Sequence, residues 1–105
     1  MTDITSLRLD NNLLGELPDW LITLTKLTEL RLENNILTVM PPVLEHFSNL
    51  TRLNVSGNWL NGVPDWVGSM TSLRMLGIGD CRLTVVPEWL RNFTELSELH
   101  LNDNE

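Results

Sequence analysis

Cys81, His46 and His100 are the clearest candidates in this sequence for nucleophilic or acid–base catalysis. A cysteine nucleophile requires a general base within hydrogen-bonding distance. Asp80 and Asp103 are the candidates for a divalent-cation site, because carboxylate oxygens are ligands that Ca²⁺ and Mg²⁺ prefer. Whether any of these side chains meet depends on the elements that position them.

The chain is built on a repeated spacing of leucine and asparagine. The frame is leucine, two variable residues, leucine, one variable, leucine, two variable and asparagine. It starts at Ile4, Leu27, Leu50, Leu73 and Leu96, always 23 residues apart. A fixed period of this length is typical of a solenoid, in which each repeat buries its apolar face against its neighbours. We therefore expect one domain over residues 1–105, with four complete repeats and a truncated fifth.

Each repeat is predicted to contain a short strand and a short helical segment. Leu30 and Leu32 alternate with polar residues, which is the pattern of a strand with one buried face. The return segment then places apolar residues at i, i+3, i+4 and i+7, one stripe of a short α or 3-10 helix. In the first repeat these residues are Leu17, Trp20, Leu21 and Leu24. Because the strands recur after a return segment, they must lie side by side and parallel.

An asparagine after each strand is expected to form a ladder through the interior. Its carboxamide can satisfy backbone groups that the turn would otherwise leave buried and unpaired. The ladder positions are Asn12, Asn35, Asn58, Cys81 and Asn104. A thiol is only a weak donor, so we expect a weaker rung at Cys81 and a structural role for this residue.

The repeat geometry separates the candidate chemical groups. Cys81 and His100 fall about 13 Å apart along the strand direction, and His46 lies on a return segment. Asp80 and Asp103 are expected to be solvated acids. The residues 77–79, Gly-Ile-Gly, lie within a strand and not in a phosphate-binding loop. We therefore predict no enzyme activity, no metal and no cofactor.

Tryptophan recurs on the helical stripe, at Trp20, Trp66 and Trp89. Each ring lies four residues before another apolar position of the stripe, which favours packing over a cofactor role. We expect all three to be structural.

Composition excludes several partners. Seven basic and fourteen acidic residues give a net charge of −7, whereas a nucleic-acid partner requires a basic surface. No apolar run reaches the roughly eighteen residues of a membrane-spanning helix. The single cysteine and the absence of a signal-like start favour a cytoplasmic setting.

The extended frame resembles the leucine-rich repeat of the 23-residue class. Residues 27–47 match L-x-x-L-x-L-x-x-N-x-L-x-x-L-P-x-x-L-x-x-L, with Met40 and Phe47 at leucine positions. Similar repeats occur in Ras-suppressor and Scribble-like proteins and in bacterial repeat proteins. The resemblance implies an α/β fold, a right-handed horseshoe with parallel strands on its concave face and short helices on its convex face. It also implies a scaffold that binds other proteins without catalysis.

The outward strand positions change character in the third and fourth repeats. Gly77 and Gly79 replace larger side chains there, although glycine in a strand costs about 0.5 to 1 kcal/mol relative to alanine. Met75 points outward, and Trp59 follows the ladder asparagine. Exposed apolar residues beside a glycine-floored hollow are typical of a protein-binding patch. The predicted site, for a protein or peptide, comprises Arg31, Arg52, Asn54, Trp59, Met75, Gly77, Gly79 and His100. The alternative is that Trp59 lies over its own turn and the glycines merely relieve crowding.

A different class of function is also compatible with the sequence. The inward residues Leu7 and Leu99 belong to the first and last repeats, where no capping segment is recognisable. Uncapped repeats expose apolar surface and an unpaired strand edge. The alternative function is therefore a structural element that forms a homo-oligomer by stacking through its ends.

Overall fold

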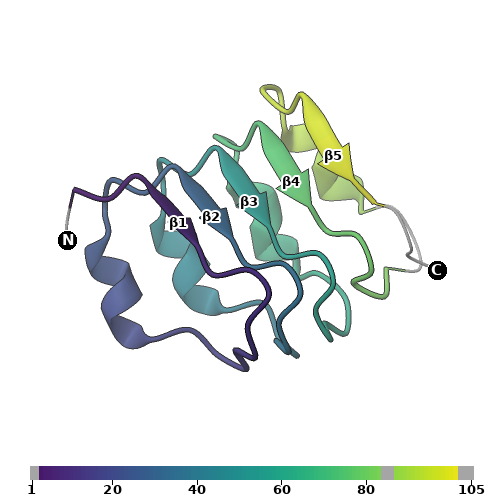
Figure 1. Ribbon diagram of the computed structural model, residues 1–105. Helices are drawn as coiled ribbons and strands as arrows, with labels where there is room; N and C mark the ends of the chain where they lie inside the picture. Colours follow the sequence, from purple (N-terminus) through teal and green to yellow (C-terminus); the bar gives the residue numbers. More distant parts are fainter. Residues whose placement is uncertain (1–2, 84–86, 102–105) are drawn as a thin grey trace.

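The computed structural model describes residues 3–83 and 87–101 of the chain. Its strands form one parallel sheet in the order β1-β2-β3-β4-β5, as Figure 1 shows. The strands are β1 (Ser6–Arg8), β2 (Glu29–Arg31), β3 (Arg52–Asn54), β4 (Met75–Gly77) and β5 (Glu98–His100). The predictions made for Asp103 and Asn104 lie outside the described residues.

The register of the sheet follows the 23-residue period. Each strand residue pairs with its equivalent in the next repeat, so the middle positions form an unbroken row. This row is Leu7, Leu30, Leu53, Leu76 and Leu99. The predicted parallel arrangement is therefore confirmed. We call the sheet face opposite these leucines the concave face; it carries the first and third residue of every strand.

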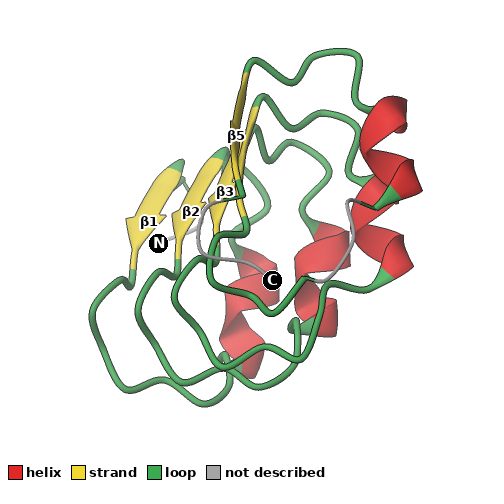
Figure 2. Ribbon diagram, turned by 90° about the vertical axis from the view of Figure 1, so that its right-hand side faces the viewer, coloured by secondary structure: helices red, strands yellow, loops and turns green. Residues whose placement is uncertain are grey.

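The helical segments lie on the other side of the molecule from the strands, as Figure 2 shows. They are η1 (Asp19–Thr23), η2 (Pro42–His46), η3 (Asp65–Ser69) and η4 (Glu88–Asn92). All four are 3-10 helices, which resolves the choice that the sequence left open. Each has five residues and follows a proline with extended backbone angles, so too few residues remain for a regular α-helix.

The core lies between these two layers and consists mainly of the repeated leucines. Leu30, Leu53 and Leu76 are fully buried. Trp66 and Trp89 are partly buried and pack against this cluster. Trp20 is 49% exposed, so the prediction that all three rings are structural and packed is wrong for Trp20.

The difference between the tryptophans has a structural reason. Trp89 packs onto Gly68 of the preceding repeat, where an added Cβ would lie 2.5 Å from the Cβ of Trp89. Trp20 belongs to η1, the helix of the first repeat, and the described residues before it, 3–18, contain no helical segment for it to cover.

The predicted ladder is present between the layers. The Asn58 Nδ2 donates to the carbonyls of Leu32 at 2.9 Å and Val55 at 2.8 Å, and its Oδ1 accepts from the amide of Leu37 at 3.1 Å. The Cys81 Sγ contacts the carbonyls of Val55 at 3.7 Å and Gly79 at 3.4 Å. Cysteine therefore keeps the position of the rung, but its contacts are longer and it lacks the carboxamide oxygen.

Neither a membrane span nor a metal cluster is found in the described part of the chain. None of its helices combines the length and apolar character needed to cross a bilayer. The residues of ranges 3–83 and 87–101 also contain no group of three or more His, Cys, Asp or Glu side chains placed to hold a metal ion.

Candidate protein-binding face

Charged side chains on the concave face are joined across strands. The Glu29 carboxylate accepts a hydrogen bond from Ser6 at 2.9 Å and another from the Arg31 Nε at 3.1 Å. The Ser6 hydroxyl, followed by Arg31, lowers the pKa of Glu29. The same contact with Glu29 raises the pKa of Arg31. Both groups therefore stay charged and are held in place before any partner binds.

Arg52 extends this network over the next two strands. Its Nε lies 3.6 Å from Glu29 on one side, and its Nη2 lies 3.8 Å from Glu98 on the other. The Arg52 side chain remains 41% exposed. A guanidinium has five N–H donors, so Arg52 keeps donors for a partner while it is oriented by the two carboxylates.

The ion pair between Arg52 and Glu98 explains the environment of Met75. In the register, Met75 lies between these two residues on the concave face. Its side chain is only 3% exposed. The prediction of Met75 as an exposed anchor is therefore wrong, because long charged side chains on either side reach over it.

His100 closes the network on β5. Its Nε2 lies 2.8 Å from the Glu98 carboxylate, and this contact is the main cause of the lowered pKa of Glu98. Both side chains are almost half exposed. The network therefore runs from Ser6 to His100, across the whole width of the sheet.

The glycine-floored hollow that the sequence predicts is filled. A Cβ at Gly77 would lie 2.3 Å from the Asn54 Oδ1, and this oxygen accepts a hydrogen bond from the Ser56 amide at 3.0 Å. The Gly79 amide donates to the Ser56 hydroxyl at 2.9 Å. The small residues thus make room for polar side chains of the preceding repeat, and the prediction of an open hollow is wrong.

Trp59 is an exposed apolar side chain beside this face. It is 63% exposed and directly follows the buried ladder residue Asn58. The equivalent residue of the first repeat, Leu13, is 83% exposed. The prediction that Trp59 is accessible is confirmed, so the apolar part of the candidate site lies at the turn and not in the middle of the sheet.

The fold places Cys81, His46 and His100 in different surroundings. Cys81 is buried, and burial raises the pKa of its thiol to about 12. His46 lies on η2 and His100 on β5, in different layers of the fold. Oriented ion pairs on an open sheet can recognise complementary charges and hydrogen-bonding groups of another molecule.

Glu29 and Glu98 belong to the network but not to the predicted site. The column Glu29, Arg52, Met75 and Glu98 could have revealed them, because opposite charges in one row of a sheet attract across neighbouring strands. Arg31 likewise pairs with Glu29, two residues earlier on the same strand.

The fold and this face define a repeat solenoid with an open parallel sheet. The sequence profile of the leucine rich repeat family matches residues 2–60 and 25–83. The chain belongs to the leucine-rich repeat family, whose members commonly mediate protein–protein interactions. No curated protein sequence is significantly similar to the chain.

Three solved structures with similar folds come from two bacteria. An internalin of Listeria monocytogenes shares 27% identity at a TM-score of 0.77, over 99% of this chain and 36% of that protein. Internalin C2 of the same organism shares 25% identity at a TM-score of 0.84, over 98% of this chain and 44% of that one. A leucine-rich repeat protein of Leptospira interrogans shares 26% identity at a TM-score of 0.76, over 99% and 33%. The chain spans less than half of each of these proteins.

Proposed function

We propose that the chain is a non-catalytic module that binds a protein or peptide on its concave face. The observation that carries this proposal is the charged network from Ser6 to His100, which has members on β1, β2, β3 and β5 and crosses β4 through the Arg52–Glu98 ion pair. Membership of a family that commonly mediates protein–protein interactions supports the same function.

The network suits recognition because its charges are already oriented. Ordering a free arginine side chain on binding costs about 0.5 to 1.5 kcal/mol. Arg31 and Arg52 are held by Glu29 at 3.1 and 3.6 Å, so part of this cost has been met on folding. Their side chains are still 32% and 41% exposed, which leaves them accessible to carboxylates or carbonyls of a partner.

Trp59 supplies an apolar contact beside the charges. Interfaces commonly combine aromatic and arginine anchors, which dominate the binding energy. We therefore propose that Arg52 and Trp59 contribute most to affinity. The surface beside these two anchors is shaped by Asn54, Gly77 and Gly79, since the Asn54 side chain fills the space above Gly77.

A peptide selection tests this function. Random twelve-residue peptides displayed on phage are selected on the full chain, and the affinities of enriched peptides are measured for Arg52→Glu and Trp59→Ala. We expect each change to weaken binding by about tenfold or more. Arg91→Glu on η4 is the matched control, because it makes the same charge change at an exposed position outside the concave face.

The control variants decide the outcome. Trp20→Ala removes another exposed tryptophan and should leave peptide affinity unchanged. If the selected peptides bind Arg52→Glu and Trp59→Ala normally but fail to bind Arg91→Glu or Trp20→Ala, the proposal of a concave binding face is wrong.

End-to-end stacking is the second candidate function. It is favoured by Leu99, which belongs to the inward row of the sheet but remains 37% exposed. Such stacking predicts a concentration-dependent mass in light scattering that Leu99→Asp abolishes. A constant mass for the unmodified chain over the whole concentration range would contradict it.

A further inference from the structure

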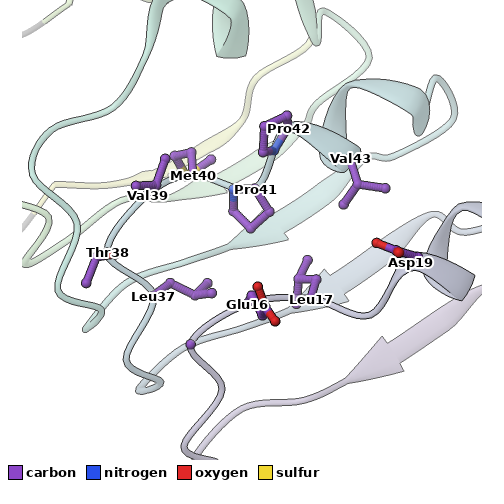
Figure 3. A pocket seen from close by; sticks show the side chains of 11 residues that line it. Glu16, Leu17, Asp19, Leu37, Thr38, Val39, Met40, Pro41, Pro42 and Val43 are labelled. Carbon is purple, nitrogen blue, oxygen red and sulfur yellow. The ribbon is translucent and has the colours of Figure 1, made fainter.

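The return segments of the first two repeats enclose a groove that is separate from the concave face. Its volume is about 430 Å³. Figure 3 shows its lining side chains. The first repeat contributes Glu16, Leu17 and Asp19, and the second contributes the segment 37–43.

The inner part of the groove is apolar. Leu37 and Met40 are buried at 1% and 2% exposure, and Pro41 is buried beside them. Gly15 also lines the groove and has no side chain to obstruct it. Val39 is 69% exposed, so it offers apolar surface to a bound molecule.

Two carboxylates line the same groove. Glu16 and Asp19 are both exposed. No lysine, arginine or histidine of the described residues forms an ion pair with either of them. Asp19 is explained in part by its place at the start of η1, where the helix dipole favours an acid. Glu16 precedes the helix and has no such explanation.

A second groove continues the first across Val39. It is lined by Thr38, Val39 and Met40, which also line the first groove, and by residues 61–64 of the third repeat. Its volume is about 340 Å³. This second groove contains no charged side chain. The two grooves therefore differ in chemistry, one acidic and one neutral, on either side of an exposed valine.

We propose that this pair of grooves binds a partner protein through an extended segment that places an arginine or lysine beside aliphatic side chains. The cationic side chain lies in the first groove, with its methylene groups against the partly buried Leu17 and Val43 and its charge near Glu16 and Asp19. The aliphatic neighbour lies against Val39 and enters the second groove. Charge complementarity selects this occupant, because no cationic side chain within residues 3–83 and 87–101 pairs with the carboxylates of the first groove.

This surface is a second interaction site, on the return segments and independent of the proposed concave face. A leucine-rich repeat module that uses both surfaces can hold two segments of one partner, or two partners, at once. Either surface can fail its test without affecting the other.

Nuclear magnetic resonance with a defined probe tests the proposal. The ¹⁵N-labelled full chain is titrated with the tripeptide acetyl-Val-Arg-Leu-amide and with the same peptide containing citrulline, which has the shape of arginine but no charge. We expect saturable shifts of the Glu16, Val39 and Val43 amides at about millimolar affinity for the arginine peptide. The citrulline peptide should bind about fivefold more weakly, and added salt should reduce the difference.

Two double variants complete the design. Glu16→Gln with Asp19→Asn should weaken binding of the arginine peptide about fivefold, while Glu45→Gln with Glu95→Gln makes the same charge change at exposed positions outside both grooves and should not. The proposal is overturned if the two peptides bind equally, if no saturable shift occurs up to about 10 mM, or if the shifts lie outside the grooves. The spectrum of each variant reports its folding, and the two-peptide comparison on the unmodified chain needs no variant.

Discussion

Replacing Asn58 by cysteine tests how the buried ladder holds the repeats together. Asn58 is 4% exposed and makes the three hydrogen bonds to Leu32, Val55 and Leu37 described above. The protein itself shows what cysteine can do here, since Cys81 occupies the next rung with sulfur contacts of 3.4 and 3.7 Å. The variant should therefore keep weak contacts to the carbonyls but leave the Leu37 amide without its acceptor.

The expected loss of stability can be worked out from these contacts. A buried donor left unsatisfied costs about 1 to 3 kcal/mol, and each weakened hydrogen bond costs about 0.5 to 1 kcal/mol. With one unsatisfied donor and two weakened hydrogen bonds, we therefore expect Asn58→Cys to lower the free energy of unfolding by about 2 to 5 kcal/mol. The free energy is measured by urea unfolding followed by tryptophan fluorescence. At a typical slope of about 1 to 3 kcal/mol per molar, the midpoint falls by about 1 M or more.

Asn12→Cys is the matched control. Asn12 occupies the ladder position of the first repeat, but it is exposed and donates to Leu9 and Asp10 at 2.9 and 3.2 Å. Water can replace these bonds, so this variant should lose less than about 1 kcal/mol. Equal losses for Asn12→Cys and Asn58→Cys would refute the role assigned to the buried carboxamide.

Three further predictions concern packing and titration. Gly68→Ala should lower the free energy of unfolding by about 1 to 3 kcal/mol, as measured by urea unfolding. The added Cβ would lie 2.5 Å from the Cβ of Trp89, whose ring is packed in place and cannot easily move. The pKa of Glu29 is lowered, mainly by Ser6, from its ordinary value of 4.5. The ionised Glu29 carboxylate therefore stabilises the fold above pH 4.5, and this stabilisation is lost as the pH falls through the pKa of the folded state. Glu29→Gln should therefore make the melting temperature less sensitive to acid. The Cys81 thiol, with its pKa raised to about 12, should not react with iodoacetamide at pH 8 in the folded protein, and rapid labelling without unfolding would contradict its burial.

The period and register could be predicted from the sequence because they depend on residue spacing. Leu30 and Leu53 fall in one row simply because they are 23 residues apart in equivalent strands. The ladder position of Cys81 followed from the same count. The 3-10 geometry of the helices was harder to predict, since short α-helices and 3-10 helices share the same i, i+3, i+4 pattern of apolar residues.

The surface of the candidate site was harder to predict because it depends on side-chain conformation. Met75 occupies an outward position, but whether it is exposed depends on how far Arg52 and Glu98 reach across it. Gly77 likewise looked like open space, whereas the Asn54 side chain fills it. A long polar side chain can adopt several rotamers, and the one it adopts depends on the hydrogen-bond and ion-pair partners around it. Residue spacing alone does not reveal these partners.

Site-specific photo-crosslinking tests concave-face binding most directly. The photoreactive residue p-benzoylphenylalanine replaces Asn54 or His100 on the concave face, and Glu45 or Arg91 on the helical side. Each variant is irradiated with a peptide selected on the full chain. Our proposal predicts crosslinks from positions 54 and 100 and none from positions 45 and 91. Crosslinks formed only from positions 45 and 91 would contradict it.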